Sequence, residues 1–316
     1  MSRETEKVLK EIQKFLALHE DGITDEESLS RVANQFLEEY NGHYPKRENT
    51  APETADDYLE LAEQATSKKK CLEYLRKAVE LEPEHLDAQL QLIAHTLEDK
   101  PDKQLPELRK LLETAAKPLE QEGYFQEDVG DFWTILETRP YMRVRQAYLD
   151  ALISCGMIRC AIDEGEALLK LCENDNLGIR YQLMHLYAYM EDEMHALALH
   201  KRFDSYEETQ MLLPLAVLYY KLNQFDRAED HIKRLAAVNK DTKKFLRAAA
   251  SKRLDRFFLD MNPYGYQPFT IEELMEDVMM STYLFASVPH FFQWASGCLR
   301  TPSAAGKKKP GAKKQP

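Results

Sequence analysis

Three alanines recur at nearly constant spacing along the middle of this chain, and each lies within an amphipathic stretch. Ala161, Ala196 and Ala228 are 35 and 32 residues apart. A small side chain lets two antiparallel helices approach closely, while large side chains fill the groove between them. Such large residues stand in pairs, four residues apart, before each alanine: Tyr148 and Leu152, Leu183 and Tyr187, and Leu215 and Tyr219.

A fourth unit has the same register in "CLEYLRKAVELEP", where Cys71, Leu75 and Ala78 precede Pro83. Helical hairpins that recur about every 34 residues with this pattern are tetratricopeptide repeats (TPRs). The 11 glycines and 30% charged residues agree with a mainly helical chain. We therefore expect an all-α fold: a TPR-like right-handed superhelix of four or five hairpins, with an N-terminal helical pair and a C-terminal helical cap.

Helical periodicity, turn residues and composition predict how the chain is divided. We expect an N-terminal helical pair at 1–44, a repeat array at 54–241 with an irregular insertion at about 117–138, capping helices at 242–298, and a disordered Lys-rich tail at 299–316.

Two capping boxes mark expected helix starts within this division. Thr24 with Glu27 is expected to begin the second helix of the N-terminal pair, and Thr270 with Glu273 a helix of the C-terminal cap. In such a box the threonine hydroxyl accepts a hydrogen bond from the backbone N–H three residues later, and the glutamate carboxylate accepts one from the backbone N–H of the threonine.

Charge, hydropathy and cysteine usage limit the surroundings in which this chain works. Its net charge is −12, and the last sixteen residues contain five lysines and no acid, so the rest is more acidic still. Such a body repels nucleic acids and anionic membrane surfaces. No apolar run reaches the roughly 20 residues of a membrane-spanning helix. Five cysteines without a CxxC pair fit reduced thiols, so we expect a cytoplasmic protein without a membrane contact.

Two motifs in the middle of the chain resemble those of a group of largely uncharacterised bacterial tetratricopeptide proteins. The resemblance covers roughly residues 54–296 and is carried by Phe132, Trp133, Glu137, Thr138, Arg139, Pro140, Tyr141, Met142 and Arg143, and then by Asn174, Asp175, Asn176, Gly178, Arg180 and Tyr181. Residues 269–295, "FTIEELMEDVMMSTYLFASVPHFFQWA", are more faintly similar to the end of the eukaryotic suppressor of tumorigenicity seven proteins, whose repeats are related. The resemblance implies a repeat scaffold without known catalysis. This chain lacks the cysteine-rich metal module that follows the repeats in some relatives.

The motif residues have a structural interpretation and a functional one. In the structural interpretation, Thr138 or Arg139 caps a helix with Pro140 in its first turn, and Asp175 caps the helix that contains Gly178. The arginines then pair with Glu137 and Asp175. We favour this role for Trp133, Glu137, Arg139, Pro140, Tyr141, Asp175, Gly178 and Arg180. The alternative is a ligand contact by Arg139, Arg143 or Arg180.

The repeat register also predicts which side chains could contact a partner. The first helix of a TPR hairpin lines the concave surface, and the register places Arg143, Gln146, Tyr181, His185, Tyr189 and Tyr220 on that lining. Aromatic and polar groups of this kind can stack on and hydrogen-bond an extended peptide. The expected function is non-enzymatic: an interaction scaffold or adaptor that binds a partner protein or peptide.

Metal, nucleotide and catalytic sites find little support. Cys155, Cys160 and Cys172 have spacings that match no common zinc pattern. His195 and His200 are five residues apart, which does not align two imidazoles on one helical face. No GxGxxG loop is present, and no set of nucleophile, base and oxyanion donors can be assembled. We expect no metal and no cofactor.

The tail offers an alternative function. Its lysines can contact RNA, DNA or an acidic protein through charge alone, which would suit a nucleic-acid-associated or ribosome-associated adaptor. They are Lys307, Lys308, Lys309, Lys313 and Lys314. A solubilising tail is the simpler interpretation.

Removal of residues 301–316 tests both interpretations of the tail. Because this segment has no apolar periodicity with which to join a core, truncation should leave helicity and melting temperature unchanged. It should weaken binding to polyanions at low salt if the lysines bind them. Circular dichroism melts and a salt titration with polyuridine measure the two effects. A lowered melting temperature would show that the tail packs against the folded chain.

Overall fold

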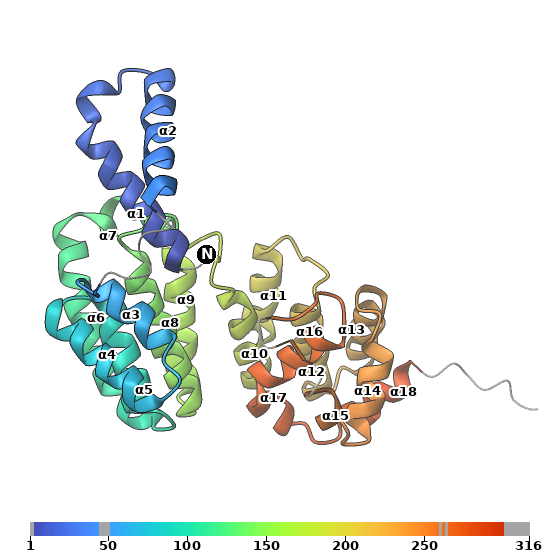
Figure 1. Ribbon diagram of the computed structural model, residues 1–316. Helices are drawn as coiled ribbons and strands as arrows, with labels where there is room; N and C mark the ends of the chain where they lie inside the picture. Colours follow the sequence, from blue (N-terminus) through green and yellow to red (C-terminus); the bar gives the residue numbers. More distant parts are fainter. Residues whose placement is uncertain (1–2, 44–50, 259–260, 263–264, 300–316) are drawn as a thin grey trace, which may run out of the picture. The chain divides into compact units, whose positions relative to one another are not determined.

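The structure is a computed structural model that describes residues 3–43, 51–258, 261–262 and 265–299. These residues are helical with connecting loops (Figure 1), and two isolated β-bridges join Gly130 and Asp131 to Cys172. The predicted all-α, TPR-like fold is confirmed. The chain forms two compact units, Met1–Asn174 and Asp175–Pro316, which are described separately below.

Three helical hairpins make up the repeats of the first unit, and each pairs a first helix with a second helix that runs back along it (Figure 1). The pairs are α3 (Ala55–Glu63) with α4 (Lys68–Leu81), α5 (Leu86–Thr96) with α6 (Pro101–Gln121), and α8 (Arg139–Ser154) with α9 (Ile158–Leu171). The close contact of α3 with α4 buries Leu59, Ala62, Cys71, Leu75 and Ala78, as the register predicts.

A separate hairpin of α1 (Arg3–Leu18) and α2 (Glu26–His43), joined through η1 (Glu20–Gly22), precedes the repeats. Its helices pack mainly on each other (Figure 1). Phe15 packs edge-on against Phe36, which stacks on Tyr40. The predicted Thr24–Glu27 capping box is wrong by one position. Ser28 N–H donates to Asp25 Oδ1 at 2.8 Å, and Asp25 N–H donates to Ser28 Oγ at 2.9 Å. Asp25 is therefore the cap, and Ser28 takes the reciprocal place of the glutamate.

The chain between α6 and α8 is held in place by backbone pairing. Helix α6 continues to Gln121, and α7 (Tyr124–Glu127) follows it. The N–H groups of Gly130 and Phe132 then donate to the carbonyl oxygen of Leu171, at 3.2 and 3.0 Å. Phe132 is completely buried at this point. The segment is therefore an ordered loop that leads from α6 to α8 and is hydrogen-bonded to the end of α9.

The second unit continues the hairpins and ends in shorter helices. The hairpins are α10 (Ile179–Met190) with α11 (Glu193–Arg202) and α12 (Thr209–Lys221) with α13 (Phe225–Val238), followed by α14 (Thr242–Ala250) and α15 (Asp255–Phe258). The last three helices are α16 (Ile271–Met280), α17 (Thr282–Ala286) and α18 (Phe291–Cys298). Helix α16 packs on α12 and α14, and α17 packs on α10 (Figure 1). The first helices of these hairpins are therefore covered by the C-terminal helices.

Thr270 begins α16, as predicted, but its capping box is incomplete. Its Oγ1 accepts from Glu272 N–H at 3.3 Å. Glu273 reaches back to Phe269 N–H at 2.8 Å, one residue before the expected backbone donor. Phe269 has a left-handed φ of 60°, which turns its N–H toward the glutamate.

The alanines of the repeat register lie in the closest helix contacts. Ala161, Ala196 and Ala228 are completely buried, as are Leu183 and Leu215 of the facing helices. This burial confirms the predicted register in both units.

Replacing Ala161 with leucine should overpack the α8–α9 contact, because no space remains around the buried methyl group. We expect a loss of about 1–3 kcal/mol in the free energy of unfolding. Urea denaturation of Ala161→Leu measures the loss, and Arg159→Leu on an exposed position of the same helix is the control. An unchanged midpoint for Ala161→Leu would contradict the close approach of the two helices.

Candidate functional site

Arg143 is the centre of a buried ion-pair network in the first unit. From α8, its Nε and Nη2 donate to the two carboxylate oxygens of Asp87 on α5, at 2.7 and 2.6 Å. Its Nη1 donates to both oxygens of Glu6 on α1, at 3.0 Å each. The side chains of Arg143, Asp87 and Glu6 are only 17%, 8% and 6% exposed. Burial acts to lower the pKa of Arg143, but its hydrogen bonds to and attraction by the two acids outweigh burial and raise it.

Arg139, one turn before Arg143, completes the network. Its Nε donates to the Trp133 carbonyl oxygen at 2.6 Å, and its guanidinium lies 5.6 Å from the centre of the Trp133 ring. Its Nη1 lies 3.4 Å from Glu6 Oε1. The acid against this arginine is therefore Glu6 rather than the expected Glu137, because Glu137 is exposed while α1 brings Glu6 into the interior.

The other residues of the first motif hold the start of α8. Thr138 is the N-cap residue, but its hydroxyl donates to the carbonyl oxygens of Phe132 and Ile135 and accepts nothing from the helix. Pro140 stands in the first turn, and Tyr141 packs edge-on against Phe125 with ring centres 5.6 Å apart. The threonine thus ties the helix to the preceding loop instead of capping its N–H groups.

The second motif builds the start of α10. Asp175 accepts from Ile179 N–H at 2.7 Å and from Arg180 N–H at 3.1 Å, and it pairs with the Arg180 guanidinium at 3.1 Å. Gly178 has a left-handed φ of 70°, and a Cβ there would lie 3.4 Å from the Tyr181 ring. Arg180 lies between the rings of Tyr181 and Phe203, 4.3 and 5.1 Å from their centres. Burial raises the pKa of Tyr181 to about 12.

The six residues predicted to line the concave surface are divided between the units. Arg143 and Gln146 are in the first unit, where Gln146 is half-buried on α8. The others are in the second unit, and three of these contact the chain's own C-terminal helices. Tyr189 lies 5.3 Å from Tyr283, and Tyr220 lies 5.4 and 5.1 Å from Phe291 and Trp294, between ring centres. The assignment of the six to partner binding stays a prediction.

His185, the third, is completely buried against Asp277 of α16. Its Nδ1 donates to the Tyr181 carbonyl oxygen at 2.7 Å, and its Nε2 lies 3.0 Å from Asp277 Oδ1. Burial raises the pKa of Asp277, and attraction to His185 opposes this only in part. The interior where α16 meets α10 therefore favours the protonated form of the Asp277 carboxyl.

A second buried polar cluster fixes the start of α16. Thr209 Oγ1 donates to Glu273 Oε2 at 2.7 Å, and the side-chain amide of Asn239 donates to the Thr270 carbonyl oxygen at 2.9 Å. Sequence reasoning missed the roles of Thr209, Asn239 and Asp277. The spacing of Glu273 and Asp277 within the apolar stretch "ELMEDVMM" places two acids on one helical face and could have indicated them.

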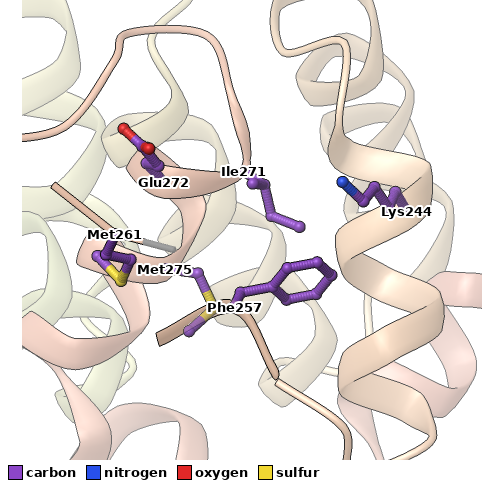
Figure 2. Close-up of a pocket in the computed structure, with 6 residues that line it drawn as sticks. All are labelled: Lys244, Phe257, Met261, Ile271, Glu272 and Met275. Atoms are coloured by element: carbon purple, nitrogen blue, oxygen red, sulfur yellow. The ribbon is translucent and has the colours of Figure 1, made fainter. Parts of the chain in front are cut away.

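A small pocket opens where α14, α15 and α16 meet. Figure 2 shows its lining of Lys244, Phe257, Met261, Ile271, Glu272 and Met275. The Lys244 ammonium group is 5.1 Å from the centre of the Phe257 ring. The pocket's volume of about 180 Å³ is below the roughly 300 Å³ at which sites for drug-sized ligands begin.

Three further findings concern metals, membranes and the tail. Within residues 3–43, 51–258, 261–262 and 265–299, no group of three or more His, Cys, Asp or Glu side chains is placed to hold a metal ion. No described helix is both long enough and apolar enough to span a bilayer. The tail lysines, Lys307 to Lys314, lie outside the described residues.

Comparisons with known proteins reach only solved structures. No protein-family model matches this chain, and no curated protein matches it. The chain is similar to the MamA protein at 13% identity and a TM-score of 0.42, over 60% of this chain and 93% of that one. It is also similar to YrrB, described as a TPR protein with an unusual peptide-binding site, at 15% identity and a TM-score of 0.40, over 64% and 92%. What the site can do follows from the contacts within this chain.

Removing the carboxyl of Asp277 should destabilise the contact of α16 with α10. Asp277→Ala leaves Nε2 of the buried His185 facing no polar side chain from α16, and a buried polar group left unpaired typically costs about 1–3 kcal/mol. Asp277→Asn is the matched variant, because its amide N–H can donate to Nε2 without a titrating proton. Urea denaturation at pH 7 should show a large loss for alanine and a small change for asparagine.

The same pair predicts a pH dependence. A carboxyl whose pKa is raised by folding contributes stability below its unfolded pKa, and this stability is lost as pH rises through the folded value. The free energy of unfolding of the wild type should therefore fall with rising pH relative to Asp277→Asn. Parallel pH dependences would contradict a raised pKa of the buried Asp277 carboxyl.

Proposed function

We propose that this chain is a non-enzymatic scaffold that binds a partner protein or peptide on the face formed by the first helices of the first unit. This α3–α5–α8 face comprises the exposed and half-buried polar side chains of α3, α5 and α8, including Glu63, Gln91, Arg143 and Gln146. The proposal keeps Arg143 and Gln146 as partner contacts. Tyr189, His185 and Tyr220 contact α16–α18 of the same chain, so they lie outside this face, and their role in partner binding stays a prediction.

One observation carries this choice of face. In the second unit, α16 and α17 lie on the first helices of the hairpins, and His185 is completely buried beneath them. In the first unit, the described residues place no comparable helix across α3, α5 and α8, and α1 reaches them through Glu6. A partner that approaches the first unit therefore meets side chains instead of a packed helix.

Polar contacts between neighbouring first helices preorganise this face. His85, the N-cap residue of α5, lies 3.1 Å from Asp56 of α3. Gln91 donates to Glu63 at 3.3 Å, and Arg143 of α8 pairs with Asp87. Side chains that are already held lose less conformational freedom when a partner binds. Stacked hairpins also present an extended surface, which suits a peptide or a helix better than a compact small molecule.

The cysteines suit a cytoplasmic location for this scaffold. All five lie in the described residues, and none is joined in a disulfide. Reduced thiols persist in a reducing compartment.

Affinity capture with the intact chain tests the proposed function. Glu63→Ala with Gln146→Ala removes side chains from the α3–α5–α8 face without breaking the Arg143 network, and should weaken capture of a partner about tenfold, equivalent to about 1.4 kcal/mol. The control, Glu229→Ala with Lys233→Ala, removes an exposed ion pair from α13. Mass spectrometry identifies what is retained, and titration calorimetry measures its affinity.

Two outcomes would contradict the proposal. Equal affinity for the two double variants would exclude this face. Retention of RNA alone, lost at high salt and on removal of residues 301–316, would instead support the adaptor that attaches through its tail.

A further inference from the structure

We infer that Arg139 and Arg143 form a receptor for an acidic side chain, that Glu6 of α1 occupies it as an intramolecular ligand, and that a partner binds by displacing α1 with an amphipathic helix of its own that carries a carboxylate near its N-terminal end. This inference rests on the proposed scaffold function and specifies the partner's chemistry.

The repeats hold both arginines independently of α1. Asp87 fixes Arg143 through a bidentate pair that uses Nε and Nη2. The Trp133 carbonyl oxygen and ring fix Arg139. A guanidinium has five N–H donors in a rigid fork. Glu6 accepts hydrogen bonds from the Nη1 groups of the two arginines, which these contacts do not use. The receptor therefore stays formed when α1 moves away.

The charge balance favours an anionic ligand at this position. Of the two acids that act on Arg143, Asp87 belongs to the repeats and Glu6 belongs to α1. Glu6 lies 3.0 Å from Arg143 and 3.4 Å from Arg139, so its removal takes the same carboxylate from two largely buried guanidinium groups. Removing one member of a buried ion pair is strongly unfavourable. A carboxylate of another helix satisfies the same donors, whereas a neutral side chain does not replace the charge of Glu6.

The attachment of α1 is suited to displacement. Apart from Glu6, its described side chains are half-buried or exposed, and its aromatic contacts are made to α2. An element with few buried apolar contacts opens at low free-energy cost. The helices that cover the second unit are held by buried apolar contacts instead, because their Leu274, Leu284 and Phe291 are completely buried.

The ligand in place shows what a competing helix needs. It requires a carboxylate close to its N-terminal end and apolar residues on the same helical face, as Glu6 is followed three residues later by the half-buried Leu9. Because α1 is covalently tethered, it competes at a high effective concentration. A partner therefore needs contacts beyond the carboxylate, and the α3–α5–α8 face supplies them.

The experiment uses the full chain and a fluorescein-labelled peptide with the sequence of residues 3–18, "RETEKVLKEIQKFLAL". Glu6→Lys in the chain sets a cation against two arginines and should expel α1. Fluorescence anisotropy should show at least tenfold tighter peptide binding to Glu6→Lys than to the wild type. A peptide in which Gln replaces its Glu6 should bind at least tenfold more weakly to that variant.

Further substitutions locate the receptor. Adding Arg143→Gln to Glu6→Lys should abolish the gain, whereas adding Arg109→Gln, which removes an arginine of α6 that contacts Tyr148, should leave it unchanged. If Arg143→Gln lowers the melting temperature, Asp87→Asn with Arg143→Gln removes both members of the buried pair and keeps the test valid.

Three results would overturn the inference: no gain in Glu6→Lys, equal binding of the Gln peptide, or binding that survives loss of Arg143. Failure here is distinguishable from failure of the scaffold function. A captured partner that depends on Glu63 and Gln146, but whose affinity is the same for wild type and Glu6→Lys, would leave the scaffold function standing. Without any captured protein or peptide partner, the scaffold function itself would fail.

Discussion

The close approach of paired helices at small residues is the contact on which the rest of this structure depends. Where Ala161, Ala196 and Ala228 are buried, the second helix of each hairpin lies directly against the first. This arrangement uses one side of each first helix for packing within its hairpin. Its outward side must still be satisfied by solvent, by another element of the chain or by a partner.

The two units satisfy that outward side in different ways. The second unit covers it with α16–α18, where Asp277 lies buried against His185 and Glu273 accepts a hydrogen bond from Thr209. The first unit keeps a polar face, whose helices are linked through Asp56, Gln91 and Arg143. Among the described residues, Glu6 of α1 covers the Arg143 end of this face. A closed unit and an accessible unit therefore arise from the same type of hairpin.

The two sequence motifs, around Arg139 and around Arg180, have both structural and binding features. Arg180 is enclosed by Asp175, Tyr181 and Phe203, so its contacts are those of a helix start. Arg139 and Arg143 are anchored within the repeats as well, yet they direct their remaining donors at a residue outside the repeats. An arginine with that geometry is both a packing element and a receptor. The residue type alone therefore does not distinguish the two roles. The contacts that each arginine makes with its neighbours distinguish them.

The sequence by itself determined the hairpins, their register and most helix starts, because these depend on residues a few turns apart. Apolar spacing predicted the burial of Leu183 and Ala196, and Thr270 was recognised as a cap. Local competition between Thr24 and Asp25 for the same N–H groups could not be resolved from spacing alone. Only the tertiary structure decided what lies on the outward faces. Glu6 and Arg143 are 137 residues apart, and in the sequence Glu6 looks like any other acid on a solvated helix. Its burial depends on where distant helices pack, and no local pattern carries that information.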